Sequence, residues 1–369
     1  EATVNNTPTS ITDLYLTIAA RHDGNSTSKF SNATIDEVRI WDTVRSQAEI
    51  SNNMNDELNG DEDGLLAYYK MNETNGTTIY DATSNNNDLT LYGGAKAGSA
   101  VGHSVAFSGG NGTSDDPYLI STLGDLKYLS EKNEYWDKHF KQTVDIDAQY
   151  TSGWNSGKGF SPIGNNSTQF TGQYDGQNYT IENLLINRPS TDNIGLFGII
   201  GDNATINNLS INNANITGKQ YTGVLSGRID GENSVIDNCE TSGSLSGNAS
   251  CGGMVGKGNS SITNSHSSVT VSAGTKDDWS DAGGLIGDAR GTITNCFVTG
   301  NVIAEGRNAG GLVGWVRGDI IISQSYTTGN VTIDSNIATG EAGGLVGSFK
   351  GSSQIVNSYA SGTISVDNS

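Results

Sequence analysis

One glycine-rich motif recurs along the second half of the chain at a nearly constant interval. Gly-Gly-Met-Val-Gly at 252–256 returns in related form at 283–287, 310–314 and 343–347, and weaker copies lie at 195–198 and 223–227. Aligned on their last glycine, the copies fall 27 to 33 residues apart. A fixed period of this size indicates a repeat architecture, in which each unit packs against its neighbours. The shared glycines are Gly198, Gly227, Gly256, Gly287, Gly314 and Gly347.

A second motif keeps phase with the first. An isoleucine, a variable residue, an amide residue and a small or apolar residue follow the later copies, as in Ile262-Thr-Asn-Ser. We predict that these amides stack in one column, where each bonds to the equivalent amide one coil above and below. Their expected role is structural. The predicted column contains Asn183, Asn208, Asn238, Asn264, Asn295 and Asn357, with Gln324 as the exception.

Between these motifs the chain reads as short strands. Apolar residues alternate, as at Val302 and Ala304, and Val, Ile and Thr dominate. Gly, Asn and Asp interrupt the strands and accept positive φ at turns. A unit of roughly 30 residues fits three strands and three turns, and coils of this kind stack about 4.8 Å apart. The prediction is an all-β solenoid of about seven coils over residues 109–369.

A solenoid needs a cover on its first coil, because an open coil exposes unpaired strand edges. Residues 123–132 supply one apolar stripe from Leu123, Leu126, Leu129 and Tyr128. Thr122 is placed to cap the helix that this stripe predicts. Because no such cover follows Ser358, we expect the natural protein to continue.

Composition narrows the choice of partners. The net charge is −20, with 40 acidic and 20 basic residues, which argues against nucleic acid and against anionic membranes as partners. No apolar run is long enough to insert this segment into a membrane. Three cysteines without a paired motif give neither a metal site nor a disulfide framework. Cys239 and Cys296 are predicted to be small buried fillers.

Residues 1–108 lack the repeat and form a separate expected domain. Strands are predicted at 14–18, 35–41 and 65–69, and Ser46 with Glu49 predicts a capped helical turn over 46–54.

Two stretches resemble known families. Gly284-Leu285-Ile286-Gly287 and its equivalents at 311–314 and 344–347 resemble the bacterial GLUG motif. That resemblance covers about 109–369 and implies a right-handed parallel β-helix of a bacterial surface protein, without implying catalysis. The segments 35–41, 49–50, 64–69 and 81–87 resemble the C-terminal part of a laminin-G-like jelly roll. This second resemblance implies a partial β-sandwich that is adhesive or glycan-binding and sometimes holds calcium. Its front half is missing, so we expect a fragment of a longer protein.

Three kinds of ligand site are predicted, each with a structural alternative. The oxygen ligands Asp81, Asn85 and Asp88 suit Ca²⁺, or a turn held by their own hydrogen bonds. Five basic residues after the repeat glycines are expected to form one column facing an acidic glycan or an acidic neighbouring domain, or to cover apolar turn surface with their stems. Trp279, Trp315 and Phe349 are the aromatic residues expected to meet a ligand. The basic column comprises Arg228, Lys257, Arg290, Arg317 and Lys350.

A further aromatic column is predicted from the same phase. Stacked aromatic rings either fill a core or form an exposed platform for sugars, and core packing is favoured here. The column comprises His266, Phe297, Tyr326 and Tyr359.

Three functions fit these features. The favoured one is a non-catalytic extracellular region of a large bacterial surface protein that adheres to cell-surface or extracellular polysaccharide, or to neighbouring domains. A stiff structural spacer is the second. The third is a polysaccharide lyase or glycoside hydrolase, for which the acidic segment 277–281 near Asp288 and Arg290 is the best site.

Overall fold

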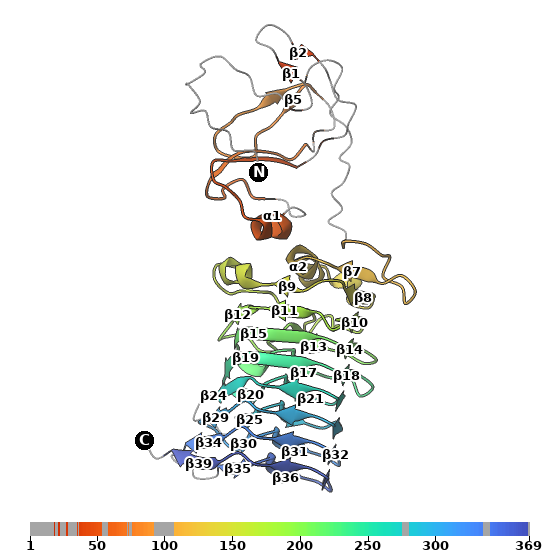
Figure 1. Cartoon of the computed structure of the whole chain (residues 1–369), viewed down its shortest axis with the longest axis vertical. Coiled ribbons are helices and arrows are strands. Elements are labelled where there is room, and N and C mark those ends of the chain that lie inside the picture. Colours follow the sequence, from red (N-terminus) through yellow and green to blue (C-terminus); the bar gives the residue numbers. More distant parts are fainter. Residues whose placement is uncertain are drawn as a thin grey trace. The chain divides into compact units, whose positions relative to one another are not determined.

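A computed structural model describes residues 18, 21–22, 27–28, 35, 37–53, 58–71, 73, 76–91, 107–274, 280–334 and 340–367. The chain divides into two compact units, Glu1–Val105 and Ala106–Ser369. The larger unit is the predicted parallel β-solenoid (Figure 1). Its coils stack in chain order from α2 (Leu123–Glu131) to β39 (Ile364–Asp367).

Two long sheets form one part of each coil. Strand pairing is parallel throughout both sheets, as expected for coils that follow one another along an axis. The nine-stranded sheet contains β7 (Tyr118–Ile120), β8 (His139–Gln142), β10 (Gln173–Asp175), β14 (Thr205–Asn207), β18 (Val235–Asp237), β22 (Ser261–Thr263), β27 (Ile293–Thr294), β32 (Ile321–Ser323) and β37 (Gln354–Val356). The 13-stranded sheet contains β9 (Ile146–Asp147), β11 (Thr180–Glu182), β12 (Leu185–Asn187), β15 (Ser210–Thr217), β19 (Glu240–Gly247), β23 (His266–Ser267), β24 (Thr270–Ala273), β28 (Phe297–Val298), β29 (Val302–Ala304), β33 (Tyr326–Thr327), β34 (Val331–Asp334), β38 (Tyr359–Ala360) and β39.

Two shorter sheets complete the coil and meet at a two-residue corner. The five-stranded sheet contains β16 (Gln220–Gly223), β20 (Ala249–Gly252), β25 (Asp281–Gly283), β30 (Asn308–Gly310) and β35 (Glu341–Gly343). The six-stranded sheet contains β13 (Phe197–Ile200), β17 (Ser226–Ile229), β21 (Val255–Gly258), β26 (Ile286–Ala289), β31 (Val313–Arg317) and β36 (Val346–Lys350).

The repeat glycines let these two short sheets approach each other. A Cβ on Gly256 would lie 2.4 Å from the backbone nitrogen of Thr222, and one on Gly252 would lie 1.9 Å from the carbonyl oxygen of Val255. Neither glycine has positive φ. Close backbone packing, rather than the turn conformation expected from sequence, therefore requires glycine at these positions.

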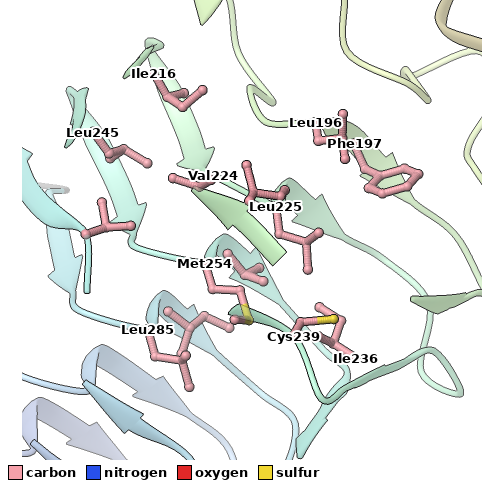
Figure 2. Packing of buried hydrophobic residues seen from close by; sticks show 14 of the residues in the cluster. Leu196, Phe197, Ile216, Val224, Leu225, Ile236, Cys239, Leu245, Met254 and Leu285 are labelled. Carbon is pink, nitrogen blue, oxygen red and sulfur yellow. The ribbon is translucent and has the colours of Figure 1, made fainter. Parts of the chain in front are cut away.

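The core runs along the inside of the coils. One position of the corner is filled in successive coils by Leu196, Leu225, Met254, Leu285 and Leu312, all fully buried. Figure 2 shows Leu196, Leu225, Met254 and Leu285 packed near Ile236 and Cys239, which come from the nine-stranded sheet and its corner. Cys239, Cys251 and Cys296 are free and buried, which confirms the prediction for Cys239 and Cys296.

Helix α2 covers the first coil as predicted. The Thr122 hydroxyl caps it by accepting from the backbone N–H of Asp125, and the Asp125 carboxylate accepts from the Thr122 backbone N–H. Leu123, Leu126 and Leu129 are buried in the solenoid core. Short 3-10 turns follow at Asn133–Tyr135 and Gln149–Gly153.

The described residues of the smaller unit form antiparallel pairs. β3 (Val38–Trp41) pairs with β4 (Leu65–Tyr69), β5 (Thr78–Ile79) with β6 (Leu89–Thr90), and β1 (Arg21–His22) with β2 (Thr27–Ser28). Helix α1 (Gln47–Asn53) begins after Ser46, which bonds to Glu49 as predicted. Most of the strand predicted at 14–18 lies outside the described residues. The likeness to a laminin-G domain stays a prediction.

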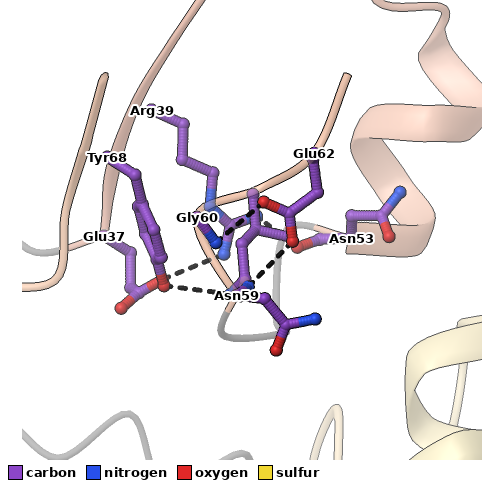
Figure 3. A network of polar contacts seen from close by, with 8 residues as sticks. Glu37, Arg39, Asn53, Asn59, Gly60, Glu62 and Tyr68 are labelled. Atoms are coloured by element: carbon purple, nitrogen blue, oxygen red, sulfur yellow. Dashed lines mark hydrogen bonds and ion pairs between the residues drawn. The ribbon is translucent and has the colours of Figure 1, made fainter. Parts of the chain in front are cut away.

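In the smaller unit, a network of polar side chains surrounds Tyr68 (Figure 3). The Tyr68 hydroxyl donates to Glu37 Oε2 at 2.5 Å and accepts from the Leu58 backbone N–H at 3.1 Å. Arg39 forms an ion pair with the same Glu37 oxygen at 2.9 Å and donates to the Asn53 carbonyl. Burial, followed by the bond to Glu37, raises the pKa of Tyr68. These bonds fix β3, β4 and the end of α1 together.

Candidate functional site

An aromatic ladder lies on the outer face of the 13-stranded sheet. Its rings come from equivalent positions of β23, β28, β33 and β38, which pair in register. Ring centroids are 4.4, 5.2 and 5.2 Å apart, and interplanar angles are 7°, 5° and 5°. The strand spacing imposes this near-parallel stack. In order, the ladder is His266, Phe297, Tyr326 and Tyr359.

The prediction of core packing for these rings is wrong. His266, Phe297 and Tyr326 are half-buried, Tyr359 is 58% exposed, and the following Ser267, Val298 and Thr327 point inward. In the first three of these coils the small residue before the ring is also buried, as at Cys296. Alternation along a strand therefore turns each ring outward. His266 Nε2 lies 3.1 Å from Glu240 Oε1, which occupies the same line one coil earlier.

The five basic residues do not form one column, so this prediction is also wrong. Arg228 pairs in register with Lys257, but Lys257 pairs with Asp288, and Asp288 pairs with Trp315. Arg317 and Lys350 pair with each other two residues further along their strands. Arg290 follows the end of β26 and is exposed. The predicted column combined residues that follow their repeat glycine by one position with residues that follow it by three, and these occupy different positions of the coil.

Nearby acids accompany three of these cations. Arg228 forms an ion pair with Asp230 at 2.7 Å. Lys257 Nζ and Arg317 Nε lie 3.6 and 3.2 Å from the Asp288 carboxylate. Oppositely charged side chains on adjacent strands attract one another, which removes the repulsion expected of a purely basic column.

Three of these charged residues line a pocket of about 260 Å³ at the outer junction of the two short sheets. The ends of β21, β26 and β31 supply its charged side, and the starts of β16 and β20 supply the opposite side. The lining residues are Gln220, Tyr221, Ala249, Ser250, Lys257, Asp288 and Arg317.

Two backbone positions of this pocket are unusual. Tyr221 has φ +56° and Ser250 has φ +47°, a region that residues other than glycine, asparagine and aspartate rarely adopt. Such conformations cost of order 1–3 kcal/mol and persist where surrounding contacts determine them. The carbonyl of Tyr221 accepts from the Ile194 backbone N–H in the preceding coil at 3.0 Å.

The carboxylates at this junction are deeply buried. Asp281 is 1% exposed and Asp288 is 0% exposed. Asn308 donates to Asp281 Oδ1 at 2.7 Å, while Asp281 Oδ2 and both Asp288 oxygens lack a hydrogen-bond donor of acceptable geometry among the described residues. Burial, with Asp288 nearby, raises the pKa of Asp281 to about 7 against the bond from Asn308 and the attraction of Arg317 and Arg307.

Cations flank the pocket in contact with aromatic rings. Lys257 Nζ lies 5.0 Å from the centre of the Tyr221 ring, and the Arg317 guanidinium lies 3.4 Å from that of Trp315. Trp315, a predicted ligand-binding residue, is half-buried and lies next to the pocket through its contact with Arg317. Trp279 and the acidic residues Asp277 and Asp278 lie outside the described residues.

The predicted amide column is present in part. Direct bonds link Asn238 to Asn208 and Asn295 to Asn264, whereas Asn264 donates to Asp237 rather than to Asn238. The residues of the column follow in-register strands and have φ between +50° and +55°; they are Asn208, Asn238, Asn264, Asn295, Gln324 and Asn357. Asn183 follows β11 in the 13-stranded sheet, where Asn213 donates to its Oδ1 at 2.7 Å. The Ile-Glu-Asn stretch resembles the motif, but the register of β11 places Asn183 in a different sheet.

The predicted calcium ligands form a turn. The Asp81 carboxylate accepts hydrogen bonds from the backbone N–H groups of Tyr68, Thr83 and Asn87, and from the Thr83 hydroxyl. These bonds lower its pKa, although burial opposes them. Asp88 Oδ1 accepts from the Asp81 backbone N–H, and the Asn85 amide donates to the Leu66 carbonyl. Because donor hydrogens already occupy both Asp81 oxygens, the hydrogen-bonded turn accounts for these residues better than Ca²⁺ does.

Sequence reasoning missed Tyr221, Ser250 and the role of Asp288. One signal was present: Asp288 follows its repeat glycine directly, where Arg228 and Lys257 follow theirs. No helix among the described residues is long and apolar enough to cross a membrane.

No protein-family model matches the chain. Halomucin of Haloquadratum walsbyi is 34% identical over 201 residues, which are 52% of this chain and 2% of halomucin. A protein of Evansella cellulosilytica named "Putative Gly-rich membrane protein" is 39% identical over 119 residues, 29% of this chain and 13% of that protein. The chain therefore spans only a small part of either curated relative.

One crystal structure supports the fold. A protein from Bacteroides ovatus described as a "putative immunoglobulin A1 protease" superposes with a TM-score of 0.53 and 23% identity, covering 70% of this chain and 86% of that one. This likeness concerns the fold alone. The larger unit is a parallel β-solenoid, and the chain is similar in sequence to segments of halomucin and of a protein named as a putative Gly-rich membrane protein.

Proposed function

We propose that this chain is a non-catalytic, extracellular segment of a large cell-surface protein and that it adheres to polysaccharide. The observation that carries the proposal is the outward aromatic ladder from His266 to Tyr359. Four coils present these rings in one line along the solenoid axis. Aromatic residues with an apolar body and a polar tip are favoured at wet binding surfaces.

The ladder suits an extended chain more than a single ring. The faces of Phe297 and Tyr326 are covered by their neighbours in the stack, so their edges face solvent together with the phenolic hydroxyl of Tyr326. A polysaccharide lying along the axis would place its C–H groups on these edges and exchange hydrogen bonds with the hydroxyls. The similarity to halomucin and to the Gly-rich membrane protein supports a surface location.

A polysaccharide array, read for both binding and cleavage, tests the proposal on the full chain. The double variant Phe297→Ser/Tyr326→Ser should lose at least about tenfold in affinity, because each exposed aromatic contact contributes about 0.5–1.5 kcal/mol. Ile303→Ser is the matched control, since Ile303 is 43% exposed on the same sheet outside the ladder. Binding that the double variant leaves unchanged contradicts the proposal.

A structural spacer is the second candidate. All four sheets continue from coil to coil without a break in strand order, which suits a stiff rod. An array on which the wild-type chain binds nothing favours this function. Cleavage of a glycan would favour the lyase or hydrolase alternative.

A further inference from the structure

The pocket between the two short sheets contains buried groups that the solenoid fold does not satisfy. Asp288 lines it and is fully buried. Lys257 Nζ and Arg317 Nε form ion pairs with its Oδ2 at 3.6 and 3.2 Å, but neither Asp288 oxygen accepts a hydrogen bond among the described residues. A buried acceptor without a hydrogen bond destabilises the folded chain, and a charged one does so more strongly. A bound molecule that donates hydrogen bonds at this point would recover that free energy.

We propose that this pocket binds a single neutral sugar residue. Asp288 accepts hydrogen bonds from its hydroxyls, Lys257 and Arg317 donate to the same hydroxyls, and the Tyr221 ring borders one side. The proposal rests on the polysaccharide binding proposed above and adds a second, specific contact for it.

The buried acids limit the positive charge of the pocket. Two carboxylates, Asp281 and Asp288, lie beside three cations, Lys257, Arg317 and Arg307, so the cluster carries one net positive charge when all five are ionised. An anionic sugar would meet cations that these buried acids largely compensate, which favours a neutral ligand. A metal ion would have to displace two cationic side chains lying within 4 Å of the carboxylates, and hard metal ions prefer sites of oxygen ligands.

The functional groups match hydroxyls in both directions. A sugar hydroxyl is at once a donor and an acceptor, so one hydroxyl can bond to Asp288 and to a neighbouring cation. Charge-assisted bonds of this kind are roughly twice as strong as bonds between neutral groups. The Gln220 side chain is placed on the opposite side of the pocket with further donor and acceptor capacity.

The size of the pocket limits the ligand. Its volume of about 260 Å³ lies below the roughly 300–1,000 Å³ of sites that enclose drug-sized molecules. One sugar residue, internal or terminal in a glycan, is therefore the expected occupant.

Calorimetric titration of the full chain with individual sugars tests this assignment. The probes are neutral hexoses and N-acetylhexosamines, the uronates of glucose and galactose, and calcium chloride. At least one neutral sugar should bind with a Kd on the order of 1 mM, as expected for so small a ligand. Binding of only the uronates or only Ca²⁺ overturns the proposal.

Variants locate the binding. Asp288→Asn retains the shape of the side chain and Lys257→Met retains its length, and each should weaken the neutral sugar at least about tenfold, since a bond to a charged group contributes about 1.5–3 kcal/mol. Tyr221→Gly removes the ring while tolerating the positive φ, and it serves if either first variant fails to fold. Lys350→Met is the matched control on the exposed end of β36. Sugar binding unchanged in all pocket variants overturns the assignment.

The two proposals fail separately. Wild-type chain that binds no polysaccharide on the array contradicts the proposed function, whatever the pocket does. Polysaccharide binding that depends on Phe297 and Tyr326, without binding of any neutral monosaccharide, contradicts the pocket assignment alone.

Discussion

The side-chain amide of Asn295 donates to Asn264 Oδ1 at 2.8 Å, and the two residues adopt φ +55° and +50°. Each asparagine therefore serves two purposes at the corner between the nine- and 13-stranded sheets. It adopts the left-handed conformation that turns the chain, and its side chain connects one coil to the next. Asparagine combines tolerance of that conformation with both a donor and an acceptor.

Replacing Asn295 should separate these two contributions. Asn295→Ala loses the bond and forces a Cβ-bearing residue without local compensation into the left-handed region, at a combined cost of about 2 kcal/mol. Asn295→Gly loses only the bond and should cost about 1 kcal/mol. Urea unfolding of the two variants measures the difference. Equal destabilisation would show that the backbone conformation contributes nothing.

The corner glycines offer a matched pair. Gly256→Ala should destabilise the solenoid by more than about 3 kcal/mol, because its Cβ would lie 2.4 Å from backbone nitrogen of Thr222 and neither element can withdraw. Gly258→Ala should be tolerated, since its nearest contacts are 3.4 Å away and Ala289 fills the paired position in the next coil. Thermal unfolding measures both variants. Similar losses in the two would contradict the close-packing explanation.

The cover of the first coil depends on Asp125. Its buried carboxylate accepts from the backbone N–H groups of Ser108, Ser121 and Thr122, and from the Ser108 hydroxyl. Asp125→Ala leaves these donors unsatisfied and should cost about 3 kcal/mol or more, whereas Thr122→Ala should cost about 1 kcal/mol. Hydrogen exchange should accelerate first in α2 and β7. Acceleration spread evenly over all coils would contradict a local role.

The thiols should be inert in the folded chain. Burial raises the pKa of Cys239, Cys251 and Cys296 to about 12 each, so almost no thiolate is present at neutral pH and none of the three sulfurs is accessible. A thiol reagent such as Ellman's reagent should label the protein only after denaturation. Rapid labelling of the native chain would place at least one cysteine outside the core.

Much of this fold could be predicted from sequence because its repeats keep local chemistry in phase. The strands, the amide corner and the capped helix each depend on residues within one coil. The strand register of the basic residues could not be predicted in this way. These residues lie one or three positions after their repeat glycine, and only the pairing of strands shows that Lys257 and Arg317 occupy different positions of the coil. The pocket was beyond prediction, since it joins residues from four coils.

The orientation of the aromatic ladder was nevertheless available from the sequence. Cys239 and Cys296 were predicted to be buried, and a strand alternates inward and outward residues. The residue after each buried position, such as Phe297, must therefore face outward. The prediction that these rings pack in the core rested on their apolar character and not on their place in this alternation.

Asp281 predicts how stability changes with pH. Its pKa is raised to about 7 in the folded chain, mainly by burial, against an ordinary value of 3.8. Below pH 3.8 the carboxyl is protonated in both states and imposes no penalty. Between that pH and 7 the unfolded state releases its proton while the folded state keeps it, so this group lowers the free energy of unfolding as pH rises. The loss reaches about 4 kcal/mol at most, since one pKa unit corresponds to about 1.4 kcal/mol.

The variant Asp281→Asn isolates this contribution, because an amide does not titrate and its oxygen can still accept the bond from Asn308. Urea unfolding of both proteins from pH 4 to pH 8 should show the variant gaining stability relative to wild type as pH rises, with the difference levelling off above pH 7. Asp230→Asn is the control, because Asp230 is exposed beside Arg228 and should give no such rise. Parallel pH profiles for wild type and Asp281→Asn would mean that Asp281 ionises normally, for example because Lys257 and Arg317 stabilise its charge together with that of Asp288.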